Sequence, residues 1–560
     1  MPKPCFHTST LRRACRAGTP LRLGVLVCAC VSGVLTLRVT AQESGAPAPA
    51  QPPADQQAAQ QTSADEPTLY IREYRVVGSK ALERPAVEEA VYGYLGPGRT
   101  AQDVEGARAA LEKAYRDKGF QTVSVSVPMQ RAAGGVVFLQ VTEAPVGRLR
   151  VNGSRFYDIN KIKARVPSLA QGTLPNFNKV EKEIIALNQS GDLQITPSLA
   201  AGVMPGTVDV NLVVKDKFPL HGSVELNNRY SANTTPLRLD LSLRYDNLWQ
   251  LGHTIGFGFQ IAPQRIQDAL IYSGYYIAPV PGVDWLSVMA QAIRQNSNVS
   301  TLGGSAVAGN GSVIGGRLLF DLPGKKGFFH SASFGADYKD FTQDLSINGA
   351  TTGSPIQYFP FSLSYTAAWV GKNYQTEFSG GVTWSFRGIG SDETDFDNRR
   401  YASDASFFYF RGSLGNTLDL PWGFQAYGLV QGQASAQPLV DTEEFALGGL
   451  NTVRGYLESA VLGDSAFAGT LELRSPSLLW WAPEGNEWRV FGFLDGGVAW
   501  VNDPLPEQQD EFSLASAGVG STIKLFEHLN GSVVLGVPFI TQSPNTAYDP
   551  LLSFRVWGEL

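Results

Sequence analysis

The sequence predicts a transmembrane β-barrel of about 16 antiparallel strands, preceded by two small α+β domains. Composition is the first reason: charged residues are 17% of the 560, against roughly 25% in soluble domains, whereas glycine (59 residues) and aromatics (11%) are abundant. Mean hydropathy is close to zero, and no apolar run after the N-terminus reaches the roughly 18 residues of a spanning helix. The third reason is the strict alternation of apolar and polar residues in the C-terminal part, which is typical of barrel walls.

Residues 1–41 predict a secretory signal peptide. Several arginines precede an apolar stretch from Leu23 to Leu37, and the small-residue sequence Val39-Thr40-Ala41 offers a cleavage site. A membrane anchor is the alternative, and the short apolar stretch disfavours it. All four cysteines of the chain lie in this segment: Cys5, Cys15, Cys28 and Cys30. The mature chain would therefore have neither disulfides nor thiolate chemistry.

The charge balance of the mature chain argues against nucleic acid as a partner. Residues 1–41 carry six of the 45 basic residues and no acidic one, which leaves 39 basic against 51 acidic residues. A nucleic-acid-binding surface needs an excess of positive charge.

Residues 42–67 are rich in glutamine, alanine and proline and predict a disordered linker. Residues 68–144 then predict a small domain in the order β-α-α-β-β, and residues 145–217 repeat that order. In the first domain, the helix over 100–118 begins at Thr100, with Asp103 three residues on, close to a capping box. In the second, the stretch Phe177 to Leu187 has apolar residues at helical spacing.

Residues 218–560 predict the barrel. From Leu237 to Tyr245 the leucines and the tyrosine share one face, and charged or hydroxyl side chains share the other. In a barrel the apolar face contacts lipid and the polar face lines the lumen. Sixteen strands of about ten residues fit the segment, and fourteen or eighteen also fit. Within it, the charged stretch 388–404 is expected to form an exposed loop.

Two short motifs in the barrel carry opposite charges. The first is Val453-Arg454-Gly455-Tyr456, which follows Gly448-Gly449, and the second is Phe493-Leu494-Asp495-Gly496-Gly497. The parity of the second stretch turns Asp495 toward the lumen, where a carboxylate needs a partner. An arginine on a loop that folds inward supplies a bidentate one. The alternative is an exposed arginine and a strand-end aspartate that never meet.

Together these features resemble a known family. The tandem α+β units are similar to POTRA domains (polypeptide-transport-associated). The motifs with Val453, Arg454, Gly455 and Tyr456, and with Phe493, Asp495 and Gly497, resemble loop six and its wall partner in the outer-membrane translocators of two-partner secretion. These are the TpsB-type ShlB/FhaC/HecB proteins of the BamA-type superfamily.

The resemblance implies a translocator in the outer membrane of a Gram-negative bacterium, with POTRA domains in the periplasm. Its cargo would be a large secreted partner (a TpsA-like exoprotein), which the POTRA domains capture at an exposed sheet edge. Loop six would reach into the lumen, where Arg454 meets Asp495, with Tyr456 and Phe493 packed around the pair. Outer-membrane lipids and the barrel assembly machinery are further expected partners.

Rival functions find less support. An outer-membrane enzyme would need a nucleophile and a base, but the histidines of the mature chain are scattered and no G-x-S-x-G occurs. We therefore expect no catalytic residue, metal or cofactor. An assembly factor that inserts other barrels is the main alternative, and two POTRA domains rather than five favour export. A passive porin would not need the POTRA pair.

Overall fold

The computed structural model describes residues 68–560 except 132, 189–190, 301–306, 348–349 and 484. The predicted signal peptide and linker lie outside the described residues. The described chain divides into two compact units, one up to Asp216 and one from Lys217 to Leu560. None of the described helices is both long enough and apolar enough to cross a membrane.

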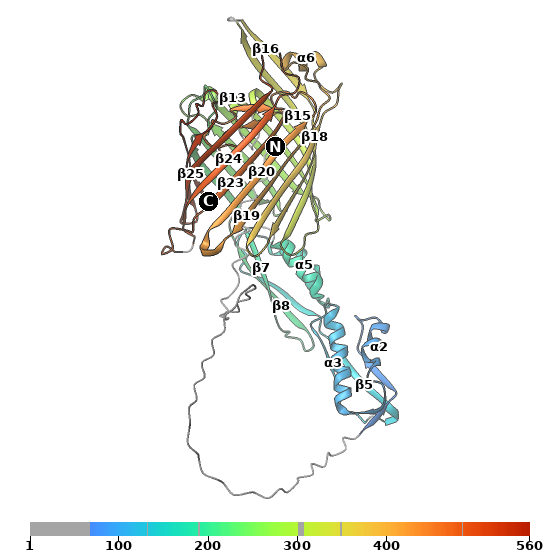
Figure 1. Ribbon diagram of the computed structural model, residues 1–560. Helices are drawn as coiled ribbons and strands as arrows, with labels where there is room; N and C mark the ends of the chain where they lie inside the picture. The colour runs from blue at the N-terminus through green and yellow to red at the C-terminus, as the bar shows by residue number, and fades with distance from the viewer. Residues whose placement is uncertain (1–67, 132, 189–190, 301–306, 348–349, 484) are drawn as a thin grey trace, which may run out of the picture. The chain divides into compact units, whose positions relative to one another are not determined.

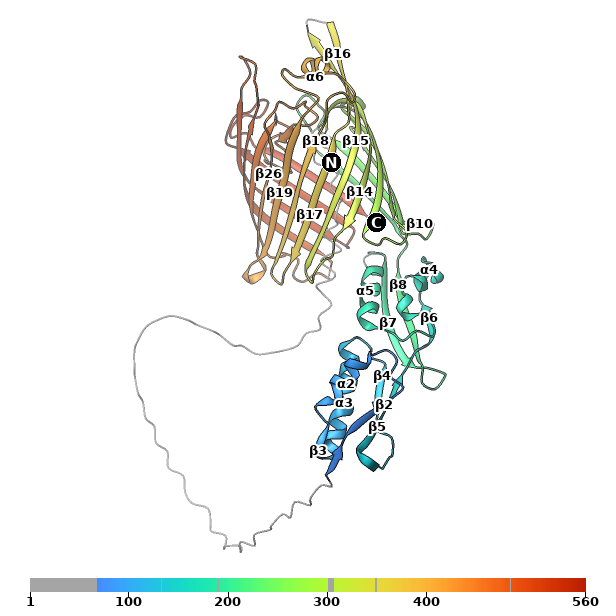
Figure 2. The same ribbon diagram turned by 90° about the vertical axis from the view of Figure 1, so that its right-hand side faces the viewer.

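The first half of the N-terminal unit is a three-stranded sheet, in the order β2-β5-β4, with two helices on one face (Figures 1 and 2). A small pair, β1 with β3, is added to the predicted order. Its elements are β1 (Leu69–Ile71), β2 (Glu73–Val77), α2 (Arg84–Tyr92), β3 (Gly96–Arg99), α3 (Ala101–Asp117), β4 (Val123–Ser126) and β5 (Val136–Glu143). The apolar stripe of α3, which includes Leu111 and Tyr115, is fully buried in the core of this half.

The second half repeats the arrangement with a core of its own. Its sheet has the order β6-β8-β7, and β6 runs parallel to β8. Its elements are β6 (Val146–Asn152), α4 (Ile159–Ala164), α5 (Phe177–Leu187), β7 (Leu193–Ala201) and β8 (Val208–Asp216). The predicted order includes a helix before α5, but the sequence did not locate α4, because six residues are too few to display a periodic apolar stripe.

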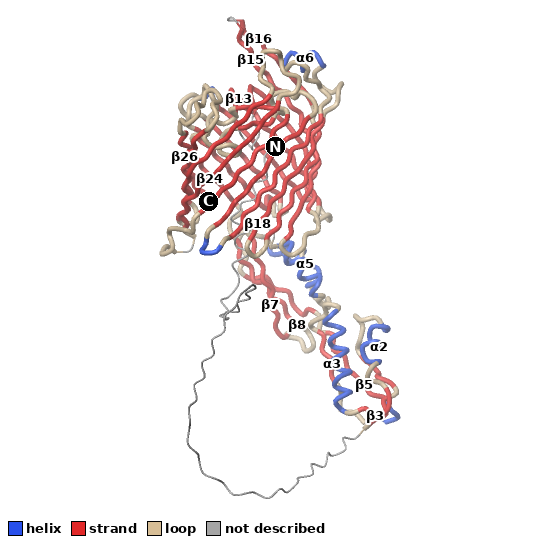
Figure 3. The backbone as a smooth tube through the Cα atoms, viewed as in Figure 1, coloured by secondary structure: helices blue, strands red, loops and turns tan. Residues whose placement is uncertain are grey.

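The C-terminal unit is a closed antiparallel barrel, and Figure 3 shows its inclined wall of strands. The wall strands are β9 (Leu220–Asn227), β10 (Arg238–Leu248), β11 (His253–Ile261), β12 (Ala269–Pro279), β13 (Leu286–Ser300), β14 (Val307–Asp321), β15 (Phe328–Ile347), β16 (Ala350–Tyr358), β17 (Phe361–Val370), β18 (Tyr374–Trp384), β19 (Phe408–Asp419), β20 (Gln425–Ser435), β23 (Ser465–Arg474), β24 (Glu487–Trp500), β25 (Glu511–Leu525), β26 (Leu529–Pro538) and β27 (Leu551–Glu559). The first strand, β9, pairs with the last, β27, and so closes the wall.

The long strand β15 has two successive partners on one side. Its first half pairs with β17 and its second half with β16, so that β16 and β17 act as one interrupted strand. Counted this way, the described wall has sixteen strands, which confirms the predicted fold class. The β15–β16 hairpin projects beyond the rim beside α6 (Glu393–Arg399), as Figures 1 and 2 show.

Alternation along the strands decides which side chains face inward. On β24, Leu494 is 58% exposed on the outer face, whereas its neighbour Asp495 is 5% exposed. A barrel wall must present apolar side chains to lipid, and polar groups can then only be accommodated inside. The predicted parity of this strand is therefore correct, and Asp495 points into the lumen.

Candidate functional site

The candidate site lies on the long connection between β20 and β23, residues 436–464, which we call loop six. A short hairpin of β21 (Phe445–Leu447) and β22 (Val461–Gly463) supports its tip. Most of the tip is buried, although a loop between barrel strands is ordinarily solvated. Apolar side chains of the tip and of the wall form one cluster, in which Leu447 and Val453 are fully buried against Ala468. Loop six is therefore packed inside the barrel.

Arg454 of loop six contacts Asp495 of β24 through three hydrogen bonds. Its Nε donates to Oδ2 at 2.7 Å and its Nη2 to Oδ1 at 2.9 Å, and its backbone N–H also donates to Oδ2 at 3.0 Å. The Asp495 side chain has no solvent exposure and that of Arg454 only 9%. Such a bidentate pair satisfies both oxygens of a carboxylate that water cannot reach.

A second carboxylate completes the site. Glu472 lies on β23, the wall strand beside β24, and its Oε2 accepts from Nη1 of Arg454 at 2.7 Å. Its other oxygen accepts from Nε of Arg474 at 2.5 Å. The four groups alternate in sign and sum to zero net charge. Sequence reasoning missed Glu472, although its position between Leu471 and Leu473 indicated an inward-facing acid.

The aromatic ring of Phe493 presents its face to the guanidinium group of Arg454. The Arg454 guanidinium carbon lies 3.7 Å from the ring centroid of Phe493 and 5.8 Å from that of Phe491. A desolvated arginine gains from this cation–π geometry as well as from its carboxylates. The structure thus brings Arg454, Asp495 and Phe493 together, all of which the two motifs singled out.

The two motif glycines are required for close approach. Gly455 has a φ of +89°, and a Cβ there would lie 3.0 Å from the backbone of Gly536 on β26. A Cβ on Gly497 would lie 3.2 Å from Val453. Both glycines therefore let loop six lie directly against the wall.

Tyr456 fastens the turn after Arg454. Its ring is 1% exposed, and its hydroxyl donates to the carbonyl of Ile540 at 2.8 Å and accepts from the N–H of the same residue at 3.2 Å. The same oxygen lies 3.1 Å from the carbonyl of Ala515 on β25. Tyr456 therefore ties loop six to β25 and to the segment that follows β26, on the opposite side of β24 from β23.

The outer base of loop six is held by the connection between β18 and β19. Arg400 pairs with the fully buried Asp464 (Nη1 to Oδ1 2.5 Å), and Arg399 pairs with Asp441 (Nη2 to Oδ2 3.0 Å). The stretch 388–404 was expected to be exposed, but the side chain of Arg399 is 1% exposed. This expectation was wrong for the two arginines, because their carboxylate partners lie more than 40 residues away on loop six.

Fold and site together define a closed β-barrel, preceded in the chain by α+β units, with a loop anchored inside its lumen. Two family models match the chain. The POTRA domain of the ShlB type matches residues 69–144, and the haemolysin secretion/activation protein ShlB/FhaC/HecB matches residues 357–523. The second match includes both Arg454 and Asp495. The resemblance found in the sequence is thereby confirmed: the chain is similar to outer-membrane translocators of the ShlB type, and it lies in the outer membrane with its POTRA region in the periplasm.

Relatives of similar length support this similarity. The chain is 22% identical over 509 residues to the outer membrane transporter CdiB of Dickeya dadantii (strain 3937), covering 84% of the chain and 83% of the relative. It is 23% identical to the protein of the same name from Escherichia coli O6:K15:H31 (strain 536 / UPEC), covering 77% and 72%.

Solved structures share the fold. CdiB from Escherichia coli superposes with a TM-score of 0.62 at 18% identity, covering 89% of this chain and 92% of that one. BamA from Haemophilus ducreyi lacking POTRA domains 1–3 superposes with a TM-score of 0.53 at 13% identity, covering 88% and 100%.

Proposed function

We propose that this protein exports a large secreted partner, a TpsA-like exoprotein, through its barrel, and that loop six acts as a latch inside the lumen. The observation that carries the proposal is the buried contact between Arg454 and Asp495, which joins a loop to the wall. A conducting barrel must not leak at rest. A loop held by one cluster of charges is an element with two states, which an incoming chain can bias.

Energetics support a latch rather than a permanent plug. Removing one member of a buried ion pair costs roughly 3–5 kcal/mol, because the other charge is left uncompensated. Displacing the whole loop instead returns both charges to water in a hydrated lumen, so the cost is much smaller. Cargo can therefore displace loop six, while the closed state is still well populated without it. Folding of the cargo outside the cell would drive transport.

The N-terminal unit supports capture of an extended chain. We assign residues 68–144 and 145–217 as two POTRA domains, after a signal peptide (1–41) and a linker (42–67). Strand β7 forms an edge of its sheet, and its end lines a groove of about 360 Å³ with Thr122 and Phe177. An unpaired edge binds an extended polypeptide through main-chain hydrogen bonds, largely regardless of sequence.

Secretion of the partner tests this function. The expected partner is a large, signal-bearing, repeat-rich protein encoded beside this one, and deleting the translocator should retain it inside the cell. Full secretion in the deletion strain would disprove export. For capture, a photoreactive residue at Leu199 on β7 should crosslink to the partner during export. Met129, an exposed apolar residue between β4 and β5, is the matched control and should not.

A further inference from the structure

Loop six carries a second buried ion pair, four residues after Arg454. Glu458 accepts from Arg229, with Nε to Oε1 at 2.8 Å and Nη2 to Oε2 at 3.3 Å. The two side chains are 17% and 7% exposed. Arg229 is not part of the wall around Asp495, because it follows β9, the first strand of the barrel.

Both the carboxylate and the backbone N–H of Glu458 make further hydrogen bonds. Its Oε1 also accepts from the N–H of Leu450 at 3.2 Å, and its own N–H donates to the carbonyl of Tyr230 at 3.0 Å. Gly449 makes room for the carboxylate, since a Cβ there would lie 2.4 Å from the carboxyl carbon. Main-chain and side-chain contacts thus fix the tip of loop six to the segment that leaves β9.

That segment belongs to the closing seam between β9 and β27. The seam register runs only from Asn227–Arg555 to Ser223–Glu559. Beyond it, the backbone N–H of Asn228 donates to the carbonyl of Phe554 (3.3 Å), and its side chain donates to the carbonyl of Leu552 (2.8 Å) and accepts from the N–H of Phe554 (2.7 Å). Arg229 is the next residue along the chain.

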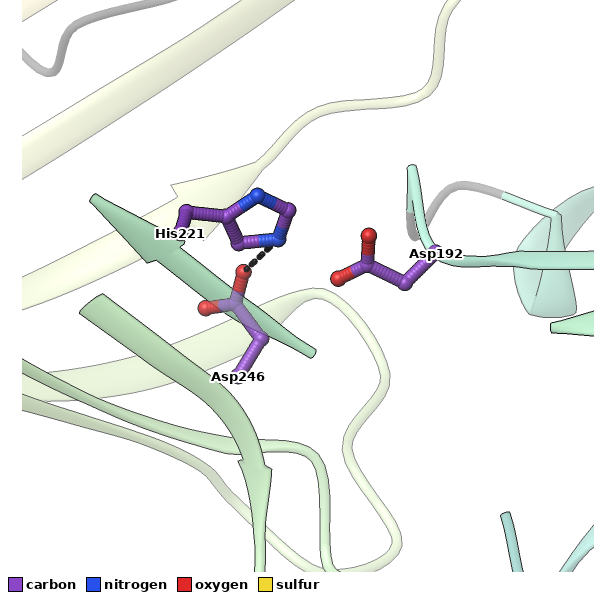
Figure 4. Close-up of side chains that lie close together, drawn as sticks. All are labelled: Asp192, His221 and Asp246. Atoms are coloured by element: carbon purple, nitrogen blue, oxygen red, sulfur yellow. Dashed lines mark ion pairs between the residues drawn. The ribbon is translucent and has the colours of Figure 1, made fainter. Parts of the chain in front are cut away.

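On its other side, β9 is held more firmly. Its register with β10 extends from Asn227–Arg238 to Leu220–Tyr245. In addition, the ring of His221 on β9 points at the carboxylate of Asp246 on β10, with Nε2 and Oδ2 3.5 Å apart (Figure 4). At the end of β9 nearest Arg229, Nδ2 of Asn227 also donates to Oδ2 of Asp240 on β10 at 2.7 Å. Because the register with β10 is also the longer one, a displacement of this end should separate β9 from β27 before it separates β9 from β10.

We propose that the Arg229–Glu458 pair couples loop six to this seam, so that release of the loop from the lumen loosens the outer part of the β9–β27 contact. The proposal rests on loop six being a latch, and it assigns Arg229 and Glu458 as positioning residues of that latch. Arg454 sets where the loop touches the wall, and Glu458 sets which pair of strands responds when it leaves.

The test uses the full-length protein alone in planar lipid bilayers. Arg229→Glu and Glu458→Arg should each raise the frequency of large openings about tenfold or more, and the double exchange should restore the parental frequency. Glu458→Gln, which keeps the shape of the side chain, should raise it in the same direction. Arg317→Glu is the matched control, since it breaks a buried pair with Asp337 on β14 and β15, two strands that do not border the seam. It should leave openings nearly unchanged.

A crosslink then separates coupling from a merely local contact. The described residues contain no cysteine, so Leu226→Cys with Val556→Cys, facing partners across the seam, can be bridged by a short thiol-specific reagent. The bridge should suppress the openings of the Glu458→Arg protein. The same bridge between Leu243→Cys and Phe257→Cys, on β10 and β11, should not.

Three results would overturn the proposal. These are parental opening frequencies in both single variants, a double exchange no better than the singles, or openings that persist when the seam is bridged. Heat-modifiable electrophoretic mobility verifies that each barrel is folded. The bilayer recordings contain no cargo, so their outcome does not depend on export. Normal export by a variant without Arg454 would refute the latch function, whereas the seam result would stand independently.

Discussion

The guanidinium group of Arg454 and the carboxylate of Asp495 form a bidentate pair, at 2.7 and 2.9 Å, between a loop and the inner wall of the barrel. The two residues are 41 positions apart and meet only because loop six enters the lumen. Glu472 on the neighbouring strand accepts a hydrogen bond from Nη1, the third nitrogen of the same guanidinium. One arginine thus connects loop six to two adjacent strands.

Replacing either partner of this pair should abolish export. Arg454→Ala leaves two buried carboxylates facing each other, and Asp495→Ala leaves the arginine with one partner, so loop six loses its position. With a cost of roughly 3–5 kcal/mol, the latched state should fall by a hundredfold or more. Secretion of the partner protein measures the loss, while the barrel remains folded in the membrane.

The matched control for this experiment is Arg317→Ala. Arg317 pairs with Asp337 between β14 and β15 at 2.9 Å, and both side chains are 9% exposed, but neither touches loop six. Its loss should leave export intact. Normal export by both the Arg454 and Asp495 variants would remove the pair from the mechanism.

Glu472→Gln should have a weaker effect than Asp495→Asn. Arg454 directs one hydrogen bond to Glu472 but three, including that of its backbone N–H, to Asp495. Glutamine can still accept from Arg454 through its one carbonyl oxygen, so the charge and the contact with Arg474 are lost but the contact with Arg454 remains. The rate of export for the two variants in parallel gives the ranking, and an equal or larger loss for Glu472→Gln would contradict it.

Gly455→Ala should displace loop six without changing any charge. The left-handed backbone costs an alanine roughly 1–2 kcal/mol, and its Cβ would press on the backbone of Gly536. Protease accessibility of loop six should increase and export should fall. Gly469→Ala on β23, where a Cβ meets nothing closer than 4.0 Å, is the control and should behave like the parent.

Arg400→Ala should loosen the outer base of loop six while leaving its tip in place. Arg400 contacts Asp464 and also donates to the carbonyls of Leu439 and Asn502. Without it, Asp464 loses its cation, and cleavage by an external protease near Leu439 should become faster. Unchanged protection would indicate that the Arg399–Asp441 pair suffices.

In the N-terminal unit, Thr100→Ala should lower the free energy of unfolding by about 1 kcal/mol, because the hydroxyl caps α3. The backbone N–H of residue 100 and the Thr100 hydroxyl lower the pKa of Asp103. A pKa lowered by folding stabilises the unit above the ordinary pKa of aspartate, and this contribution is lost as pH falls through the folded pKa. Urea unfolding of residues 68–216 against pH should show this loss in the parent and less of it in Asp103→Asn.

Much of this architecture is readable in the sequence because it depends on local periodicity. Alternation along residues 490–500 places Asp495 inside any barrel, and helical spacing around Leu111 places α3 on its sheet. Glu472 could also have been found by the same alternation. Arg399 and Arg400 could not, since nothing near them in the chain indicates the carboxylates of loop six. The split of β15 between β16 and β17 likewise depends on pairing across strands rather than on pattern.

By itself, the sequence determined the order of the parts, the face of each strand and the presence of an inward carboxylate that needs a cation. These follow from short-range rules: a strand has period two, a helix has period 3.6, and a buried charge must be paired. Tertiary structure alone decided that loop six turns inward, and that its tip contacts β23, β24 and the segment that follows β9. The path of a loop depends on contacts between residues far apart in the chain, such as Arg229 and Glu458, which only the closed barrel brings within reach.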